Sequence, residues 1–119
     1  MEINREIPPS EAEINFFLEK LDFNLPDGYL EFIKKSNGCD ITIDDRFILL
    51  WPLTELFELN LGYEVNDFAP RFFLFGSNGG DTAYGIEKKT GKIFSLPFIG
   101  LADLEARYIC DTFHEFLND

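Results

Sequence analysis

The chain has 119 residues, of which 45% are hydrophobic and 16% aromatic, and its formal net charge is −12. This size and composition favour one globular domain over residues 1–119 and exclude an intrinsically disordered chain. No apolar run approaches the roughly 18 residues of a membrane span, and the acidic surplus argues against direct binding to nucleic acid or to an anionic membrane.

The first predicted helix covers residues 11–21. Ser10 and Glu13 form the S-x-x-E pattern of a capping box, and apolar residues follow at helical spacing. A second helix is predicted over residues 26–36, because a proline opens the segment, two lysines suit its C-terminal end and an Asn-Gly pair follows. Each helix carries one apolar stripe and is expected to bury that face.

Residues 41–43 and 46–51 are predicted to form two strands joined by a tight turn at Asp44-Asp45. The segment 52–62 predicts a short helix or a single turn that ends at a glycine. Residues 63–70 show neither period and are expected to be irregular.

Residues 71–77 are apolar and aromatic, as in a buried central strand, and residues 82–98 predict two strands joined by a turn at 89–91. A final helix is predicted over residues 102–117 from an apolar stripe at helical spacing. Helices, then antiparallel strands, then a helix indicate an α+β domain. We expect a mainly antiparallel or mixed sheet flanked by N-terminal helices and a C-terminal helix.

The stretch "FGSNGGDT" at residues 75–82 has the glycine content of a phosphate-binding loop. It lacks the Gly-Lys-Ser/Thr end of such a loop, an acid stands where a cation would be needed, and the following sequence alternates as in a strand. We therefore interpret the glycines as a corner between two strands. Gly79→Val or Gly80→Val is expected to damage the fold before any binding site.

Few residues suit catalysis or metal binding. Cys39 and Cys110 are expected to be buried thiols, with a disulfide as the alternative. His114 is the only histidine and lies four residues after Cys110 on the predicted helix, but no third group orients such a pair. No catalytic residue, metal site or cofactor is predicted. The N-terminus lacks the basic start and apolar block of a signal peptide, which predicts a cytoplasmic protein.

The acidic residues are concentrated in one part of the chain. Residues 39–70 carry seven acids and one base, which is half of the net charge, and aromatic residues are interleaved with them. This pattern favours a binding face for a cationic partner over a merely solvated rim. The aromatic members would be anchors if they are exposed. The candidate residues are Asp40, Asp44, Asp45, Trp51, Glu55, Phe57, Glu58, Tyr63, Glu64 and Asp67.

Five segments occur in the order and spacing of one known group of proteins: "LPDGYLEFIKKSNG" (25–38), "ILLWPLTEL" (48–56), "FGSNGGDTAYGIE" (75–87), "IFSLPF" (93–98) and "DTFHEFL" (111–117). Over residues 10–118 the chain resembles the SUKH superfamily, which includes the fungal Smi/Knr regulators of cell-wall synthesis and many bacterial immunity proteins. Cys39 departs from the family pattern, in which a small residue often follows the Asn-Gly pair. The matching motif positions, which the resemblance assigns to shaping the fold, are Pro26, Asn37, Gly38, Gly76, Gly79, Gly80 and Asp81.

The resemblance implies a non-enzymatic α+β protein. Its bacterial branch implies a cytoplasmic immunity protein that binds and neutralises a toxin encoded beside it, often a nuclease. A nuclease site is built to receive a polyanion, so an acidic inhibitor would associate quickly and cover it. The alternatives are a regulatory or scaffold module like the fungal relatives, and a small-molecule binder or enzyme. The oligomeric state stays open.

Overall fold

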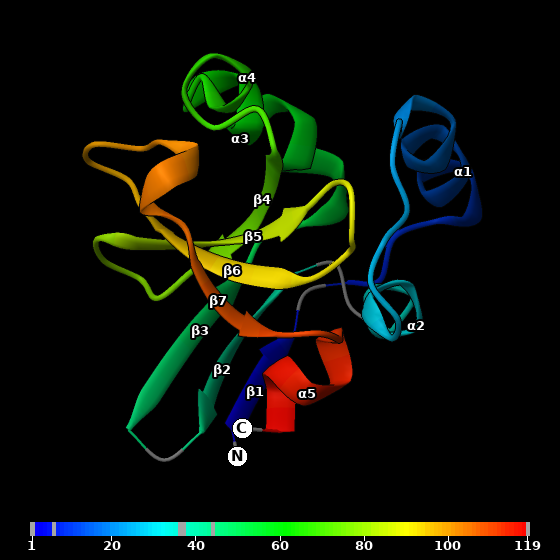
Figure 1. Ribbon diagram of the computed structural model, residues 1–119. Coiled ribbons are helices and arrows are strands. Elements are labelled where there is room, and N and C mark those ends of the chain that lie inside the picture. The colour runs from blue at the N-terminus through cyan, green and yellow to red at the C-terminus, as the bar shows by residue number, and fades with distance from the viewer. Residues whose placement is uncertain (1, 6, 36–37, 44, 119) are drawn as a thin grey trace.

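The computed structural model describes residues 2–5, 7–35, 38–43 and 45–118. Within these residues it is an α+β structure whose seven antiparallel strands pair in chain order, from β1 to β7 (Figure 1). The strands are β1 (Glu2–Arg5), β2 (Cys39–Ile43), β3 (Arg46–Leu50), β4 (Phe72–Ser77), β5 (Thr82–Glu87), β6 (Ile93–Pro97) and β7 (Arg107–Cys110). The helices are α1 (Glu11–Lys20), α2 (Tyr29–Ile33), α3 (Leu56–Gly62), α4 (Val65–Phe68) and α5 (Phe113–Asn118), with 3-10 turns η1 (Leu53–Glu55) and η2 (Asp103–Glu105).

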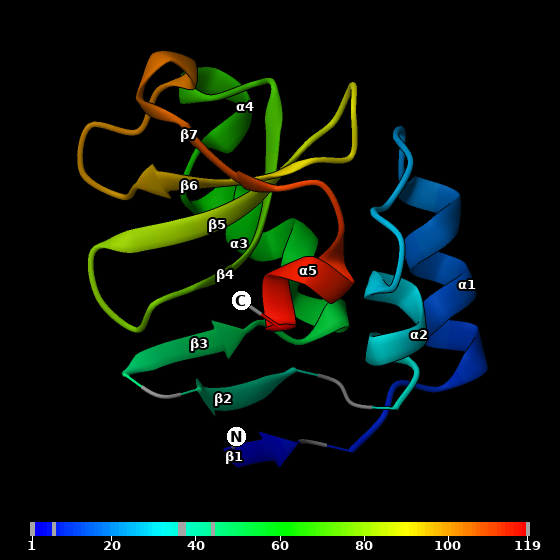
Figure 2. The ribbon, with the colours of Figure 1, turned by 60° about the horizontal axis from the view of Figure 1, so that its bottom comes forward.

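The sheet is curled, and α5 packs inside the curl (Figure 2). Arg46 Nη2 at the start of β3 donates to the Phe116 carbonyl over 3.1 Å, and the Phe116 ring lies 4.9 Å from that of Tyr84 on β5. Phe113 meets α2 through an edge-on contact with Tyr29 at 5.2 Å. The last helix therefore joins two parts of the sheet to α2.

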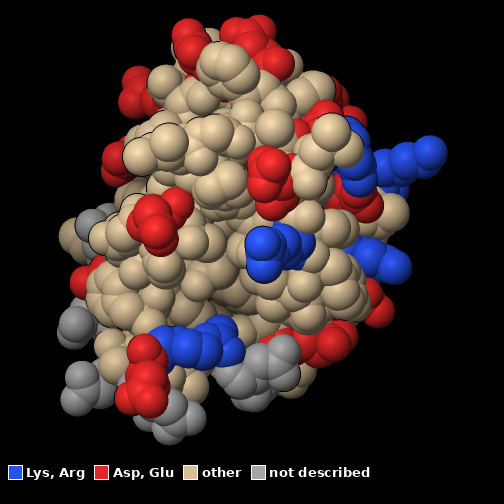
Figure 3. All heavy atoms as spheres, turned by 60° about the vertical axis from the view of Figure 1, so that its left-hand side comes forward, with Lys and Arg blue, Asp and Glu red and all other residues tan. Residues whose placement is uncertain are grey.

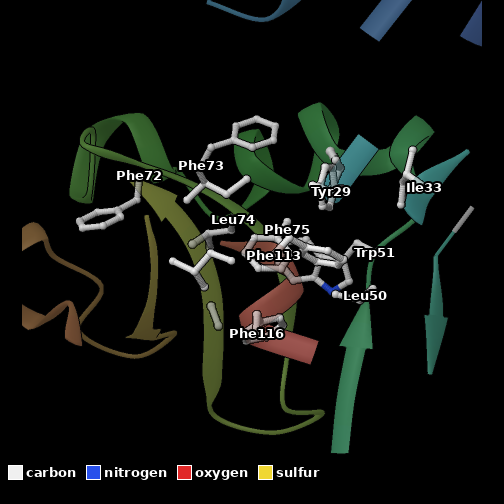
Figure 4. Packing of buried hydrophobic residues seen from close by; sticks show 14 of the residues in the cluster. Tyr29, Ile33, Leu50, Trp51, Phe72, Phe73, Leu74, Phe75, Phe113 and Phe116 are labelled. Atoms are coloured by element: carbon white, nitrogen blue, oxygen red, sulfur yellow. The ribbon is translucent and has the colours of Figure 1, made fainter. Parts of the chain in front are cut away.

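The core of the described residues combines aliphatic side chains with a cluster of eight aromatic rings (Figure 4). All six residues of β4 are buried, and Phe75 lies edge-on to Tyr29 and Phe116 at 5.8 and 5.6 Å. Such edge-to-face pairs add about 0.5–1.5 kcal/mol each beyond the burial of their area. Phe75 is therefore the central residue of this cluster.

The backbone N–H and carbonyl of Leu74 in β4, which β3 does not reach, hydrogen-bond to a side chain. β3 pairs with β4 only at Leu49 and Leu50 in the described residues, and the chain then turns away at Pro52. Asn60 of α3 takes over: its Oδ1 accepts from the Leu74 N–H at 2.8 Å, and its Nδ2 donates to the Leu74 carbonyl at 2.9 Å. Asn60 therefore fixes α3 against the central strand.

Helix α1 begins as predicted. The Ser10 hydroxyl accepts from the Glu13 N–H at 3.1 Å, and Glu13 Oε1 accepts from the Ser10 N–H at 2.8 Å, which completes the capping box. Helix α1 lies wholly within the described residues, and its buried residues are Ile14 and Phe17. Phe17 packs against Phe57 at 5.2 Å, so α1 is attached by a narrow apolar contact.

Most other predicted elements are confirmed with shifted bounds. The hairpin, the segment after it and the strands around residues 72–97 are found. Helix α2 is shorter than the predicted 26–36, because Gly28 adopts φ +90° and the chain before it forms a turn. Residues 65–68, expected to be irregular, form the single turn α4. Strand β1 was not predicted.

The predicted helix over residues 102–117 is wrong. Residues 107–110 form β7 and pair with β6, and the helix proper starts at Phe113. The supposed apolar stripe includes Leu104 and Tyr108, which are 93% and 56% exposed. Thr112 caps the true helix, because its hydroxyl accepts from the Glu115 N–H at 3.1 Å.

One carboxylate makes the fold sensitive to acid. The side chain of Glu87 accepts hydrogen bonds from Thr90 Oγ1 at 2.7 Å and from Arg71 Nη2 at 2.5 Å, and these bonds hold the Glu87 pKa below its ordinary value. The resulting stability is present above the ordinary pKa and is lost as the pH falls through the depressed one. Glu87→Gln is expected to flatten the acid side of the stability curve, measured by urea unfolding at several pH values. Glu105→Gln is the control, and equal flattening by both variants would contradict this assignment.

Candidate interaction surface

The acids of residues 39–70 that the structure describes do not form one patch in space. Asp45 lies at the tip of the β2–β3 hairpin, whereas Glu64 and Asp67 belong to the α4 segment at the opposite end of the molecule (Figure 1). Asp40 lies in β2, and Glu55 and Glu58 lie on η1 and α3. Asp44 falls outside the described residues. The sequence cluster therefore divides between a hairpin group and a helical group.

The three aromatic candidates have different positions. Trp51 is only 7% exposed and belongs to the core, so it is not an exposed anchor. Phe57 is partly buried against Phe17. Tyr63, just after α3, is 43% exposed and is the most accessible of the three.

Tyr63 lies in a short aromatic stack. Its ring is stacked on that of Trp51 at 5.9 Å with an interplanar angle of 17°, and it lies 4.8 Å from the ring of Phe98. Phe98 follows β6, and its N–H donates to the Asp81 carbonyl over 3.0 Å. We call Trp51, Tyr63 and Phe98 the aromatic stack. Phe98 is not among the predicted site residues, because its contact with Tyr63 spans 35 positions of the chain and leaves no local signal.

Exposed apolar and acidic side chains border the aromatic stack along the chain. Leu61 and Ile99 are 78% and 90% exposed. Glu64 directly follows Tyr63, and Asp67 lies one turn further on. Figure 3 shows acidic side chains gathered at the top, the end at which Figure 1 places α3 and α4. Aromatic and apolar side chains within an acidic surround are suited to contact with a positively charged protein surface.

Glu64 holds a costly backbone conformation. Its φ of 56° and ψ of 41° lie in the left-handed region, where Glu64 is the only residue other than glycine among those the structure describes. The side chain is exposed and forms no capping hydrogen bond to α4. The conformation costs a residue with a Cβ about 1–2 kcal/mol. The carboxylate therefore contributes to the surface rather than to the fold.

Glu64→Gly is expected to raise the free energy of unfolding by about 1 kcal/mol, because glycine adopts the left-handed region without the Cβ penalty. Glu64→Ala removes the same carboxylate and keeps the penalty, so its stability should match that of the wild type. Urea denaturation of the two variants measures the difference. Equal stability of the glycine and alanine variants would show that the backbone at this position is not strained.

Three N–H groups of the glycine loop at residues 75–82 donate hydrogen bonds to side chains of the same loop. The N–H groups of Gly80 and Thr82 donate to Asn78 Oδ1 at 2.9 and 3.2 Å, and the Gly79 N–H donates to Ser77 Oγ at 3.1 Å. Gly79 has φ +83°, and a Cβ there would lie 2.9 Å from the Phe47 ring. The loop is the corner between β4 and β5 that the sequence predicts, and its donors point inward.

Three further motif positions, Pro26, Gly38 and Gly76, also lie at structural contacts. The Pro26 carbonyl accepts from the Tyr29 N–H at 3.3 Å and closes the turn before α2. A Cβ on Gly38 would lie 2.8 Å from Pro52 N, and one on Gly76 would lie 2.6 Å from the Leu49 carbonyl. Asn37 falls outside the described residues.

The two cysteines are both buried thiols. Cys110 ends β7 and donates to the Thr112 carbonyl over 3.4 Å, whereas His114 is exposed on α5. The pair therefore does not share a helix, contrary to the sequence analysis. Within the described residues, no three side chains of His, Cys, Asp or Glu are grouped so as to hold a metal ion.

A family model described as the SMI1 / KNR4 family (SUKH-1) matches residues 8–119. The match leaves out β1 and includes every other strand and helix. No individual curated protein matches the chain. None of the helices in the described part of the chain is long and apolar enough to cross a membrane.

Proposed function

Because the chain belongs to the SMI1 / KNR4 family (SUKH-1), we propose that it is a cytoplasmic immunity protein that binds a cognate protein toxin and neutralises it by occlusion. Family membership supports an immunity protein or a Smi/Knr-type domain. The observation that favours immunity is the surface around the aromatic stack, which combines exposed apolar side chains with acids. Binding rather than turnover is the proposed mode of action.

The charge suggests what kind of toxin this is. A net charge of −12 produces a field that attracts a basic protein and raises its association rate by about 10- to 1,000-fold over a neutral pair. Nuclease domains are basic where they receive the phosphate backbone. We therefore propose that the toxin carries a nuclease domain, and that the acidic α3–α4 end of this protein covers its basic surface.

Co-expression tests this function. Where the neighbouring gene encodes a secreted multidomain toxin, its C-terminal domain is expressed with and without this protein. Survival of cells that make both proteins, together with their co-purification, is the expected result. Death of cells that contain intact, well-expressed protein would refute the immunity function and favour the regulatory module of the fungal relatives.

The two acidic groups give separate predictions for association with that domain. Glu64→Lys is expected to slow association about fivefold at low salt, because it reverses a charge beside the aromatic stack. Asp45→Lys makes the same change in net charge at the hairpin and should have a smaller effect. Stopped-flow mixing at several salt concentrations measures both rates. Equal slowing by the two variants would mean that only net charge matters.

A further inference from the structure

A groove separates α1 from the η1–α3 segment. Its volume is about 470 Å³, within the range of about 300–1,000 Å³ typical of ligand sites. Phe16 and Phe17 of α1, Leu53 of η1 and Phe57 of α3 line it. Phe16 is 58% exposed, compared with 53% for Phe68 and 41% for Phe47. The groove thus presents aromatic surface that the fold itself leaves uncovered.

A cation already lies within reach of both rings. The Lys20 Nζ is 4.3 Å from the centre of the Phe16 ring and 6.0 Å from that of Phe57. Both distances are within the range in which the face of an aromatic ring attracts a positive charge. The arrangement shows the chemistry that suits the groove: a positive charge within reach of two aromatic rings.

The rim of the groove adds negative charge. The elements that border it, α1, η1 and α3, carry five carboxylates and one ammonium, and two of the carboxylates, those of Glu13 and Glu58, line the groove itself. Glu13 Oε1 is engaged in the capping box, whereas Glu58 is exposed. Glu58 can therefore pair with a positive group that enters the groove.

We propose that this groove is a docking site for an arginine side chain of a basic partner protein, which takes the place of the Lys20 ammonium beside Phe16 and Phe57. The proposal rests on the proposed function in one respect, namely that the partner is basic. A guanidinium suits the position better than an ammonium does, because it is planar, is weakly hydrated and can stack on a ring while it donates to a carboxylate. Lys20 can withdraw because its four-carbon arm is flexible.

A peptide experiment tests the groove without the toxin. The probe is a short fluorescein-labelled peptide of alternating arginine and serine, and its matched control carries uncharged citrulline in place of each arginine. Fluorescence anisotropy is expected to show binding of the arginine peptide alone. Lys20→Gln should tighten binding about two- to fivefold, beyond the effect of its charge, because the competing cation is gone. Lys34→Gln, which removes an ammonium from the end of α2, is the matched control.

Two further variants localise the site. Phe16→Leu keeps an exposed apolar side chain, so the fold should persist, but it removes a ring face and should weaken binding at least about twofold. Glu58→Gln should weaken binding more than Glu105→Gln, although each removes one carboxylate. Equal affinities for Lys20→Gln and Lys34→Gln, together with no loss from Phe16→Leu, would overturn the proposal. The peptide result is independent of cell survival. If the wild-type protein protects cells but does not bind the arginine peptide, only the proposed docking site is refuted. If cells that express the protein die, only the immunity function is refuted.

Discussion

Replacing Asn60 by alanine is expected to destabilise the protein by about 3 kcal/mol, because each buried backbone group left without a partner costs about 1–3 kcal/mol. The variant orphans both the N–H and the carbonyl of Leu74, which is fully buried, and also removes the bond from Nδ2 to the Leu56 carbonyl. Urea denaturation measures the loss. Asn66→Ala is the matched control, since Asn66 is exposed and makes only a 3.4 Å contact with Lys88 Nζ in the described structure.

The Asn60→Asp variant separates the hydrogen bonds from the volume of the side chain. Its ionised carboxylate can accept from the Leu74 N–H but repels the two carbonyls, so the variant should be at least as unstable as alanine at neutral pH. A protonated carboxyl again offers one donor and one acceptor. Stability relative to wild type should therefore recover as the pH falls. No recovery would indicate that Asn60 acts through packing alone.

The second large effect is expected at Gly76. An added Cβ would lie 2.6 Å from the Leu49 carbonyl, which belongs to the β3–β4 ladder and cannot move without breaking it. We expect Gly76→Ala to cost about 3 kcal/mol, at the upper end for inserting an atom into a packed core. Gly80→Ala is the control: its nearest neighbour would be Asn78 Oδ1 at 3.5 Å, and its change should stay within about 0.5 kcal/mol.

Thermal and urea unfolding of the two glycine variants provide the measurement. A Gly76→Ala protein as stable as Gly80→Ala would mean that β3 and β4 can separate locally at no cost. The structure also distinguishes the two glycines of the β4–β5 corner, Gly79 and Gly80. Valine was expected to damage the fold at either position, but only Gly79 combines positive φ with a close contact to Phe47, and the structure imposes neither constraint on Gly80.

Local sequence signals predicted those parts of the fold whose stabilising contacts are also local. The Ser10–Glu13 capping box located α1, and apolar alternation located the central strands. The same S-x-x-E type of pattern recurs as Thr112 to Glu115 and marks the start of α5. It was overlooked because apolar residues upstream continued the helical spacing, although Leu104 and Tyr108 face solvent.

The surface was less predictable than the fold. Acids that are neighbours in the sequence lie at both ends of the molecule, because the β2–β3 hairpin runs away from the helices that follow it (Figure 1). The aromatic stack depends on Phe98, and the groove on Phe16 and Lys20, none of which belongs to the acidic segment. Such neighbours come from tertiary packing, for which sequence spacing gives no signal.

The strand order has a consequence for how the protein is made. Since every strand pairs with the strand before it in the chain, a growing polypeptide can add each one to a sheet that has already emerged from the ribosome. The exception is the closing step, because Phe113 and Phe116 cover Tyr29, Phe75 and Tyr84 from the far end of the sequence. A nascent chain that has all seven strands but not yet α5 therefore leaves the faces of Tyr29, Phe75 and Tyr84 that α5 contacts uncovered.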